Sequence, residues 1–188
     1  MPAAKASPRR AAAPPAPGAP DWRDQVFEAL ERGGIAQLCY VPDAGHSHLI
    51  RRAHASEAID AYPLTTEEEG VAAACGAWLG GQRSVLLMQS SGVGNCVNML
   101  SLVATCRFPL VALVTMRGEW AEFNPWQVPM GRATPAALAS MGLAVRRVDE
   151  TARAADEVAA AIEDAFVGDQ AVAVLFSQRM LGRKSWVK

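Results

Sequence analysis

The stretch "TTEEEGVAAACGAWLGGQRSVLLMQSSGVGN" (residues 65–95) decides the fold class, because a helical pattern passes into a buried strand within it. Residues 67–79 are typical of a helix that ends at two glycines, and residues 84–89 are a continuous apolar run. The small residues at 90–95 predict a turn. A strand that is apolar at every position is typical of a parallel sheet covered by helices on both faces.

The same alternation of helix and apolar strand continues on both sides of this stretch. Residues 43–55 are predicted to form a loop that leads into a helix, and residues 116–133 a long loop. The helix at 96–106 is apolar on nearly all sides, so we expect it to be deeply buried. Further helices are predicted at 22–32, 135–141 and 152–167, and strands at 35–42, 59–64, 109–115, 144–148 and 171–177. This order predicts an α/β fold with a three-layer α/β/α architecture, a mostly parallel sheet and right-handed crossovers.

Composition narrows the possible functions. The chain has 188 residues and a formal net charge of −1, which gives no electrostatic reason to expect a nucleic acid or an anionic membrane as a partner. No apolar run reaches the length of a membrane span, about 18 residues. Residues 1–20 are rich in alanine and proline and are predicted to be a disordered tail, which leaves residues 21–188 as one domain.

The four cysteines are not arranged as a metal-binding or redox motif. Each lies among apolar residues and none forms a CxxC pair; they are Cys39, Cys75, Cys96 and Cys106. This pattern favours buried, reduced thiols in a cytoplasmic protein, with a metal site or a disulfide as the alternatives.

Four loops should lie where a parallel sheet binds its ligands, beyond the carboxyl ends of the strands. They are 41–48, 64–69, 89–95 and 115–130, and the unusual stretches of the sequence fall in them. The loop at 89–95 contains two glycines and could cradle an anion at a helix start. The alternative is a tight turn, and the sequence contains no P-loop motif. The polar side chains at 90–98, buried beside an apolar helix, would need partners; they are Ser90, Ser91, Asn95 and Asn98.

Two other loops carry titratable or cationic residues. His46 and His48 could bind a metal, but no partner at ligand spacing supports this, so a position near a substrate is favoured and no metal site is predicted. Asp43 could form an Asx turn after Pro42. Arg117 directly follows a strand and could hold an anion, or it could be solvated on a packed loop.

The three consecutive glutamates divide by position. If Thr66 caps the helix, Glu69 stands three residues later and completes a capping box. Glu68 is expected to meet water near the helix dipole. Glu67 then has no structural task, although it lies at a helix start beside the end of a strand.

Together with "RGEW" (117–120) and the Q-x-P-M-G-x-A-T pattern at 127–134, residues 65–102 resemble the pyrimidine-binding half of thiamine diphosphate-dependent decarboxylases. The sequence is most similar to sulfopyruvate decarboxylase alpha subunits and to the amino-terminal part of phosphonopyruvate decarboxylase. The resemblance covers about residues 22–180. In the wider family a glutamate lies nine positions before a glycine of the following helix, and nine positions before Gly76 is Glu67.

The resemblance implies a cofactor, a reaction and a set of site residues. Glu67 would hydrogen-bond N1′ of the aminopyrimidine of thiamine diphosphate and favour the imino tautomer, so that the cofactor can take up a proton. The expected reaction is decarboxylation of a small anionic 2-oxo acid such as sulfopyruvate or phosphonopyruvate. The implied cofactor contacts are Glu67, Gln89, Ser91, Gly92 and Asn95; the implied substrate or proton-transfer residues are Asp43, His46, His48 and Arg117.

The family's diphosphate and Mg²⁺ motif, a GDG followed by an asparagine, does not occur in this sequence. The resemblance therefore implies a separate beta-type subunit that supplies the diphosphate and metal site, in a hetero-oligomer with a shared active site. The alternatives are carboligation, decarboxylation of another 2-oxo acid, or a non-catalytic regulatory domain of the same fold. A Rossmann-type dinucleotide domain is disfavoured because no GxGxxG follows the first strand.

Overall fold

The computed structural model of the protein describes residues 21–183, and a six-stranded parallel sheet lies at its centre. The strand order is β2-β1-β3-β4-β6-β5, and every neighbouring pair is parallel. The prediction of a mostly parallel sheet is therefore confirmed. The strands are β1 (Ile35–Tyr40), β2 (Asp60–Pro63), β3 (Arg83–Gln89), β4 (Leu110–Thr115), β5 (Ala144–Val148) and β6 (Ala171–Phe176).

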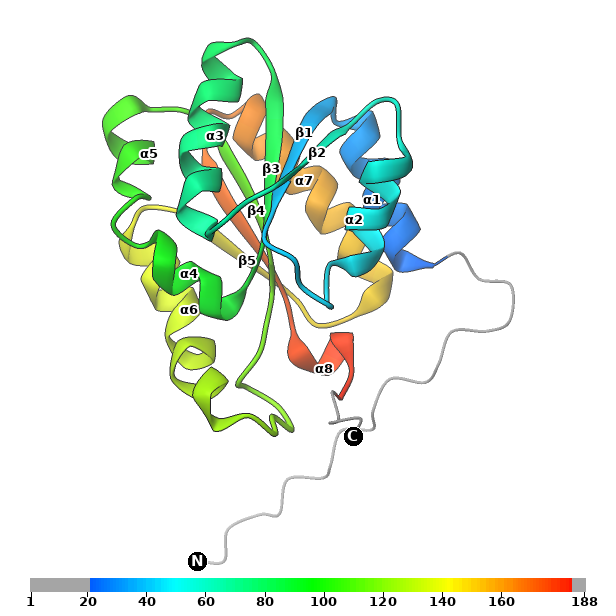
Figure 1. Ribbon diagram of the computed structural model, residues 1–188, viewed down its shortest axis with the longest axis vertical. Coiled ribbons are helices and arrows are strands. Elements are labelled where there is room, and N and C mark those ends of the chain that lie inside the picture. Colours follow the sequence, from blue (N-terminus) through cyan, green and yellow to red (C-terminus); the bar gives the residue numbers. More distant parts are fainter. Residues whose placement is uncertain (1–20, 184–188) are drawn as a thin grey trace, which may run out of the picture.

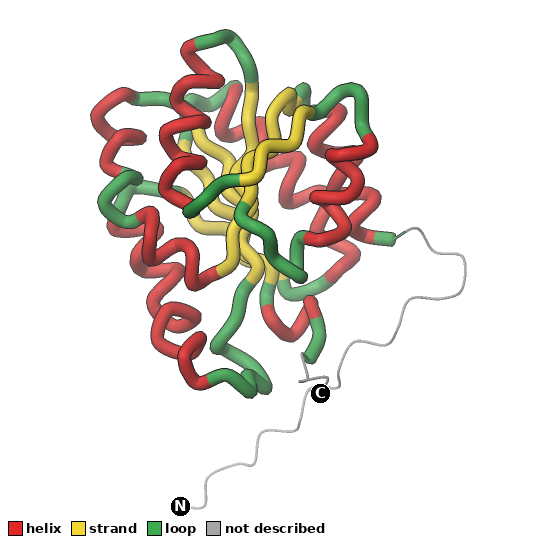
Figure 2. Tube along the Cα trace, viewed as in Figure 1, coloured by secondary structure: helices red, strands yellow, loops and turns green. Residues whose placement is uncertain are grey.

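Helices cover both faces of the sheet, as Figures 1 and 2 show. One face carries α1 (Trp22–Arg32), α2 (Ser47–Ala55) and α7 (Ala154–Phe166), and the other carries α3 (Glu67–Leu79), α4 (Ser90–Cys96), α5 (Ser101–Cys106) and α6 (Val128–Ser140). Two 3₁₀ turns, η1 (Pro125–Gln127) and η2 (Thr151–Arg153), and the short helix α8 (Gln178–Leu181) complete the described chain. The three-layer α/β/α architecture is confirmed.

The core consists of two apolar layers because successive side chains of a strand point to opposite faces. Val85 and Leu87 of β3 pack with α1 and α7, whereas Leu86 and Met88 pack with α3 and α4. All of these side chains are buried. This double burial is the physical reason that β3, β4 and β6 are nearly continuous apolar runs.

The prediction for residues 90–106 was wrong. Residues 90–95 belong to helix α4 and not to a turn, and the apolar stretch after them bends before the separate helix α5. No residue of α5 is buried. Contacts with α6 and α3 stabilise α4 in spite of its two glycines, so tertiary packing overrides a weak local propensity here.

Residues 128–140 form a second exception, because α6 begins seven residues before the predicted start at 135. Pro129 lies in the first turn of α6, where a backbone N–H would have no intrahelical partner, so it is compatible with a helix start. Pro135 lies inside the same helix. The predicted long loop is thus confined to residues 116–124 and the turn η1.

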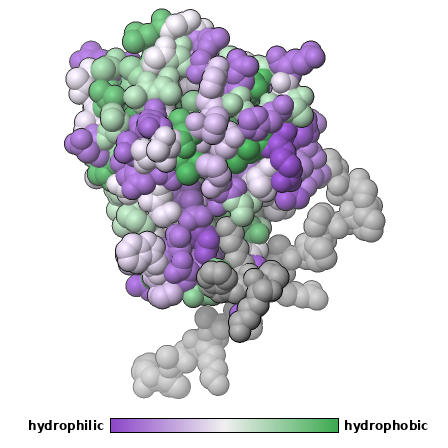
Figure 3. Space-filling model, viewed as in Figure 1, coloured by the Kyte–Doolittle hydropathy of each residue, from purple (hydrophilic) through white to green (hydrophobic). Residues whose placement is uncertain are grey.

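Hydrophilic and hydrophobic residues are interspersed on the face of the molecule shown in Figure 3. Among the residues that the structure describes, no helix is long and apolar enough to cross a membrane. The predicted disordered tail, residues 1–20, lies outside the described residues.

Candidate functional site

The predicted site loops meet at one edge of the sheet. The loops after β1, β3 and β4 follow three strands that are neighbours in the sheet, and β2 is the next strand outward. The register places Gln89, the last residue of β3, beside Thr115, the last residue of β4. The carboxyl ends of these strands therefore bring together segments that are distant in the sequence.

Glu67 lies in the first turn of α3 at this edge, and its carboxylate faces α4. Its exposed fraction is 8%, so the group is largely removed from water. The side-chain amide of Asn95 donates a hydrogen bond of 2.8 Å to Oε2. No hydrogen bond from a described residue reaches Oε1, so this oxygen can accept or donate a further one. Asn95 thus fixes the carboxyl group through Oε2 and leaves Oε1 available for a further hydrogen bond.

The close approach of α4 to Glu67 depends on Gly92. A Cβ at this position would lie 2.3 Å from Oε1 of Glu67 and 2.4 Å from its Cδ, which real structures do not tolerate.

Cys96 lies one helical turn after Gly92 and is fully buried. Burial raises the pKa of its thiol to about 12, and the negative charges of Glu67 and Glu68 act in the same direction. Cys96 thus remains a thiol and takes no part in nucleophilic chemistry.

The other two glutamates have structural partners. Oε2 of Glu69 accepts a hydrogen bond of 2.8 Å from the backbone N–H of Thr65, one residue before the N-cap Thr66, so Glu69 ties the incoming chain to the helix start. The predicted capping box does not form, because Glu69 bypasses the Thr66 N–H and the Thr66 side chain makes no cap hydrogen bond and instead donates to Glu68. This contact lowers the pKa of Glu68 and ties it to the backbone turn, so it is not simply solvated.

Asp43 joins three neighbouring strand ends. Its carboxylate accepts hydrogen bonds from Gln89 Nε2 at 2.9 Å, from Thr115 Oγ1 at 2.6 Å and from the backbone N–H of Gly45 at 3.0 Å. The last of these is the expected Asx turn. Ser91 extends the network by donating to Gln89 Oε1 at 3.0 Å. Asp43, Gln89 and Ser91 are therefore brought together, in an arrangement that holds the edge of the sheet in place.

His46 occupies a structural position beside this network. The ring is 1% exposed, and its Nε2 lies 3.2 Å from the carbonyl oxygen of Met88 and 3.0 Å from that of Leu113. Because both partners are carbonyls, this nitrogen carries the proton and donates it. His46 ties the loop after β1 to β3 and β4, and in this structure it does not face solvent from which a substrate could enter.

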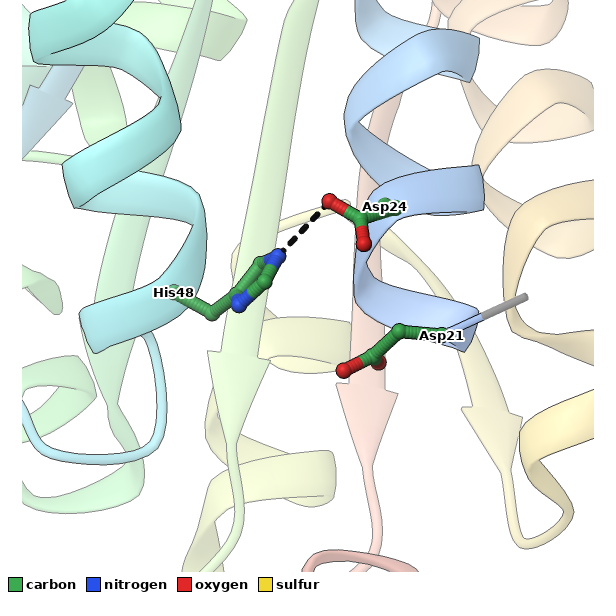
Figure 4. A group of neighbouring side chains, drawn as sticks. All are labelled: Asp21, Asp24 and His48. Atoms are coloured by element: carbon green, nitrogen blue, oxygen red, sulfur yellow. Dashed lines mark hydrogen bonds and ion pairs between the residues drawn. The ribbon is translucent and has the colours of Figure 1, made fainter. Parts of the chain in front are cut away.

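His48 belongs to α2, which covers the opposite face of the sheet from α3, the helix of Glu67 (Figure 1). Figure 4 shows its ring pointing toward Asp24 of α1, with Nε2 2.8 Å from Oδ1. Asp21, Asp24 and His48 offer ligand atoms within 4.8 Å of one another. However, Arg23 pairs with Asp21 and Arg52 with Asp24. Because both carboxylates already have cationic partners, we interpret the group as an ion-pair network that joins α1 and α2.

Arg117 is paired within its own loop and does not extend toward a ligand. Its guanidinium contacts the Glu122 carboxylate through Nε at 2.7 Å and Nη2 at 2.5 Å, and the two side chains are 9% and 3% exposed. Glu122 also accepts hydrogen bonds from the N–H groups of Gly118 and Asn124 and from the side chain of Gln178. In this structure Arg117 fixes the loop after β4, and its predicted contact with an anionic substrate would require this pair to open.

This ion pair gives a testable pH dependence. The hydrogen bonds from Arg117 outweigh the effect of burial and lower the pKa of Glu122 from 4.5 to about 2. The folded protein therefore gains stability at pH values above about 4.5 and loses it as the pH falls toward about 2. The contribution is at most about 3 kcal/mol. We expect Glu122→Gln to be less stable than the wild type at pH 6, and the difference in free energy of unfolding to shrink by pH 3.

Urea unfolding at the two pH values measures this difference. Glu57→Gln, an exposed change in the loop after α2, is the control and should behave like the wild type at both. A difference between Glu122→Gln and the wild type that stays constant with pH would contradict the assignment.

Three residues that hold this region together were not identified as site residues from the sequence. Thr115 ends a buried strand, and its polar side chain after a continuous apolar run was a usable signal. Glu122 and Gln178 had no such signal, because their role depends on contacts between the loop after β4 and α8.

A cavity of about 550 Å³ lies near the amino ends of β4, β5 and β6, at the opposite edge of the sheet from Glu67.

A known protein family matches more than half of this chain. The family model described as "Thiamine pyrophosphate enzyme, N-terminal TPP binding domain" matches residues 21–123, which include Glu67, Gly92 and Asn95. This chain belongs to the thiamine pyrophosphate enzyme family. The resemblance inferred from the residues is confirmed, and the partly open carboxyl group of Glu67 fits the aminopyrimidine half of the cofactor.

Relatives in this family are decarboxylases. The chain is 35% identical to sulfopyruvate decarboxylase subunit alpha of Methanothermobacter thermautotrophicus over 156 residues, which cover 82% of this chain and 94% of that protein. It is 38% identical to phosphonopyruvate decarboxylase of Streptomyces viridochromogenes over 103 residues, which cover 54% of this chain but 26% of that longer protein.

A solved structure supports the fold of this family member. The 2-oxoglutarate:ferredoxin oxidoreductase of Magnetococcus marinus superposes with a TM-score of 0.71 at 17% identity. The match covers 98% of this chain and 37% of that chain. At this identity the likeness concerns the fold alone.

Proposed function

We propose that the protein is the alpha-type subunit of a thiamine diphosphate-dependent decarboxylase of a small anionic 2-oxo acid, with sulfopyruvate as the first candidate. The observation that carries the proposal is Glu67, a largely buried carboxyl group with one oxygen held by Asn95 and the other free of described partners. Membership of the family and the similarity to sulfopyruvate decarboxylase alpha subunits support it.

The chain's own residues would bind and orient the pyrimidine half of the cofactor. When bound, thiamine diphosphate supplies a nucleophilic carbon and accepts the electrons released as CO₂ leaves. Glu67 holds a proton at Oε1 for the pyrimidine nitrogen, and Asn95 keeps Oε2 from rotating into that position. Gly92 leaves room for this arrangement, while Gln89 and Ser91 line the same edge of the sheet.

A separate beta-type subunit would supply the diphosphate and Mg²⁺ site. No GDG motif occurs in the sequence, and the similar methanogen proteins are named alpha subunits. The loop after β4 and the turn that follows it offer exposed aromatic surface for such a partner: Trp126 is 83% and Phe123 is 40% exposed. Exposed tryptophan is enriched at protein interfaces. Because Arg117 is paired with Glu122, we assign recognition of the substrate's anionic end to the assembled site.

We also propose that the enzyme works in the cytoplasm. All four cysteines are free thiols, two of them buried, which fits a reducing compartment.

The test is a substrate panel with the purified chain, alone and combined with a GDG-bearing partner. With thiamine diphosphate and Mg²⁺ present, the pair should release CO₂ from sulfopyruvate faster than from phosphonopyruvate or pyruvate, and the single chain should release none. Full activity of the single chain would contradict the shared site. A pair that consumes pyruvate but neither anionic analogue would contradict the substrate assignment.

A further inference from the structure

Cys75 and Cys106 stand apart from the other two cysteines because solvent can reach them. Cys39 and Cys96 are buried, whereas Cys75 is half-buried and Cys106 is exposed. The two accessible thiols lie on neighbouring helices, since α5 packs against α3 on the same face of the sheet (Figure 1). The thiol of Cys106 is also close enough to that of Cys75 to raise its pKa. Thirty-one positions apart in the sequence, they form a pair that only the fold creates.

We propose that Cys75 and Cys106 form a reversible dithiol–disulfide site, oxidised by low-molecular-weight disulfides such as oxidised glutathione. This site is independent of the cofactor chemistry proposed for Glu67, which lies at the opposite end of α3. Intracellular disulfides of this kind are transient and typical of redox sensing.

The exposure of the two residues sets the order of the reaction. The Cys106 thiolate attacks the small disulfide, so that its S–S bond breaks, a mixed disulfide forms on Cys106 and one thiolate leaves. The Cys75 thiolate then attacks Sγ of Cys106, which forms the Cys75–Cys106 bond and releases the second thiolate. The two cysteines lose two electrons and two protons, and the small disulfide is reduced to two thiols.

The electrostatics of the pair favour this order. Burial raises the pKa of the Cys75 thiol first, and the neighbouring Cys106 raises it further. Cys75 is thus a poor first nucleophile while Cys106 is free. Once Cys106 carries the adduct it has no ionisable thiol, so one cause of the raised pKa of Cys75 disappears.

The local structure allows the sulfurs to reach bonding geometry. The helix α5 is six residues long, contains no buried residue and ends directly after Cys106, where Arg107 adopts a left-handed conformation with φ of 53°. Short segments without buried side chains open at low free-energy cost. The last turn of α5 can therefore adjust, while Cys75 stays fixed within the longer helix α3.

The experiment treats the folded full-length chain with oxidised glutathione, then blocks free thiols with N-ethylmaleimide in denaturant and measures intact mass and peptide maps. The wild type should lose the mass of two hydrogen atoms, retain two alkylated cysteines (Cys39 and Cys96), and yield a linked peptide pair that dithiothreitol separates. Cys75→Ser should stop at a glutathione adduct on Cys106. Cys106→Ser should form neither product.

Three outcomes would overturn the proposal. They are a wild type that accumulates the adduct on Cys106 without the crosslink, a crosslink that forms only in denaturant, and a crosslink that involves Cys39 or Cys96. Because neither Cys75 nor Cys106 contacts the carboxyl group of Glu67, the decarboxylase activity of the reduced Cys106→Ser variant should equal that of the wild type.

Discussion

Replacing Glu67 by glutamine should lower kcat of the assembled decarboxylase by about 10²–10⁴-fold, the usual contribution of a positioned acid or base. Glutamine has nearly the shape of glutamate and can still accept the hydrogen bond from Asn95 at the position of Oε2. At the position of Oε1 it presents an amide, which cannot exchange a proton with the pyrimidine. The fold should therefore survive while the chemistry is lost.

The matched control is Glu68→Gln, the next residue on the same helix. Glu68 is hydrogen-bonded by Thr66, whereas Glu67 is hydrogen-bonded by Asn95 of α4, so the Glu68→Gln variant should keep kcat within a few-fold of the wild type. Steady-state CO₂ release, with thermal unfolding as a check on folding, separates the two variants. If Glu67→Gln were as stable and as active as the wild type, Glu67 would have no role in proton transfer.

Gly92→Ala should cost about 10²-fold in kcat/KM, because the new methyl group occupies the position of the Glu67 carboxylate. The added Cβ would lie within 2.6 Å of Cγ, Cδ and Oε1 of Glu67, so the side chain must move. A carboxyl group displaced by about 1 Å no longer meets the pyrimidine nitrogen in line.

Gly94→Ala, two residues later in the same helix, tests whether this effect is specific. Its Cβ would meet the thioether of Met130 at 3.3 Å, and a flexible methionine can move by the small distance required. Both substitutions remove a helical glycine and gain the same helix propensity. Equal losses of activity in the two variants would show that α4 tolerates no added volume and that Glu67 is not the cause.

The parts of the fold that were predictable are those with local signals. The helix α1 begins after Asp21, whose side chain accepts the N–H of Arg23, and it ends at Gly33, as the sequence pattern indicates. The mostly apolar stretches at 84–89 and 109–115 likewise identified β3 and β4. The helix α4 was missed because its stability comes from α3 and α6, and no local pattern contains that information.

The candidate site was predictable in its members more than in their roles. The strand-end rule placed Asp43 and Gln89 at the same edge, and the family spacing singled out Glu67. Two of the three donors to Asp43, however, lie 46 and 72 residues away, so only the Asx turn to Gly45 could be expected from its own loop. Arg117 is similar: the turn that brings Glu122 back to it contains Ala121 at a φ of 47°, which the sequence does not indicate.

The strand order also bears on how the chain avoids unwanted association with other chains. The outermost strands are β2 and β5, and an exposed strand edge invites other chains to extend the sheet. The strand β2 has four residues and ends in Pro63, which has no N–H to donate. The strand β5 carries Arg146 and Arg147, each paired with acidic residues beside it. Short length, proline and charge thus oppose the addition of other chains at either edge of the sheet.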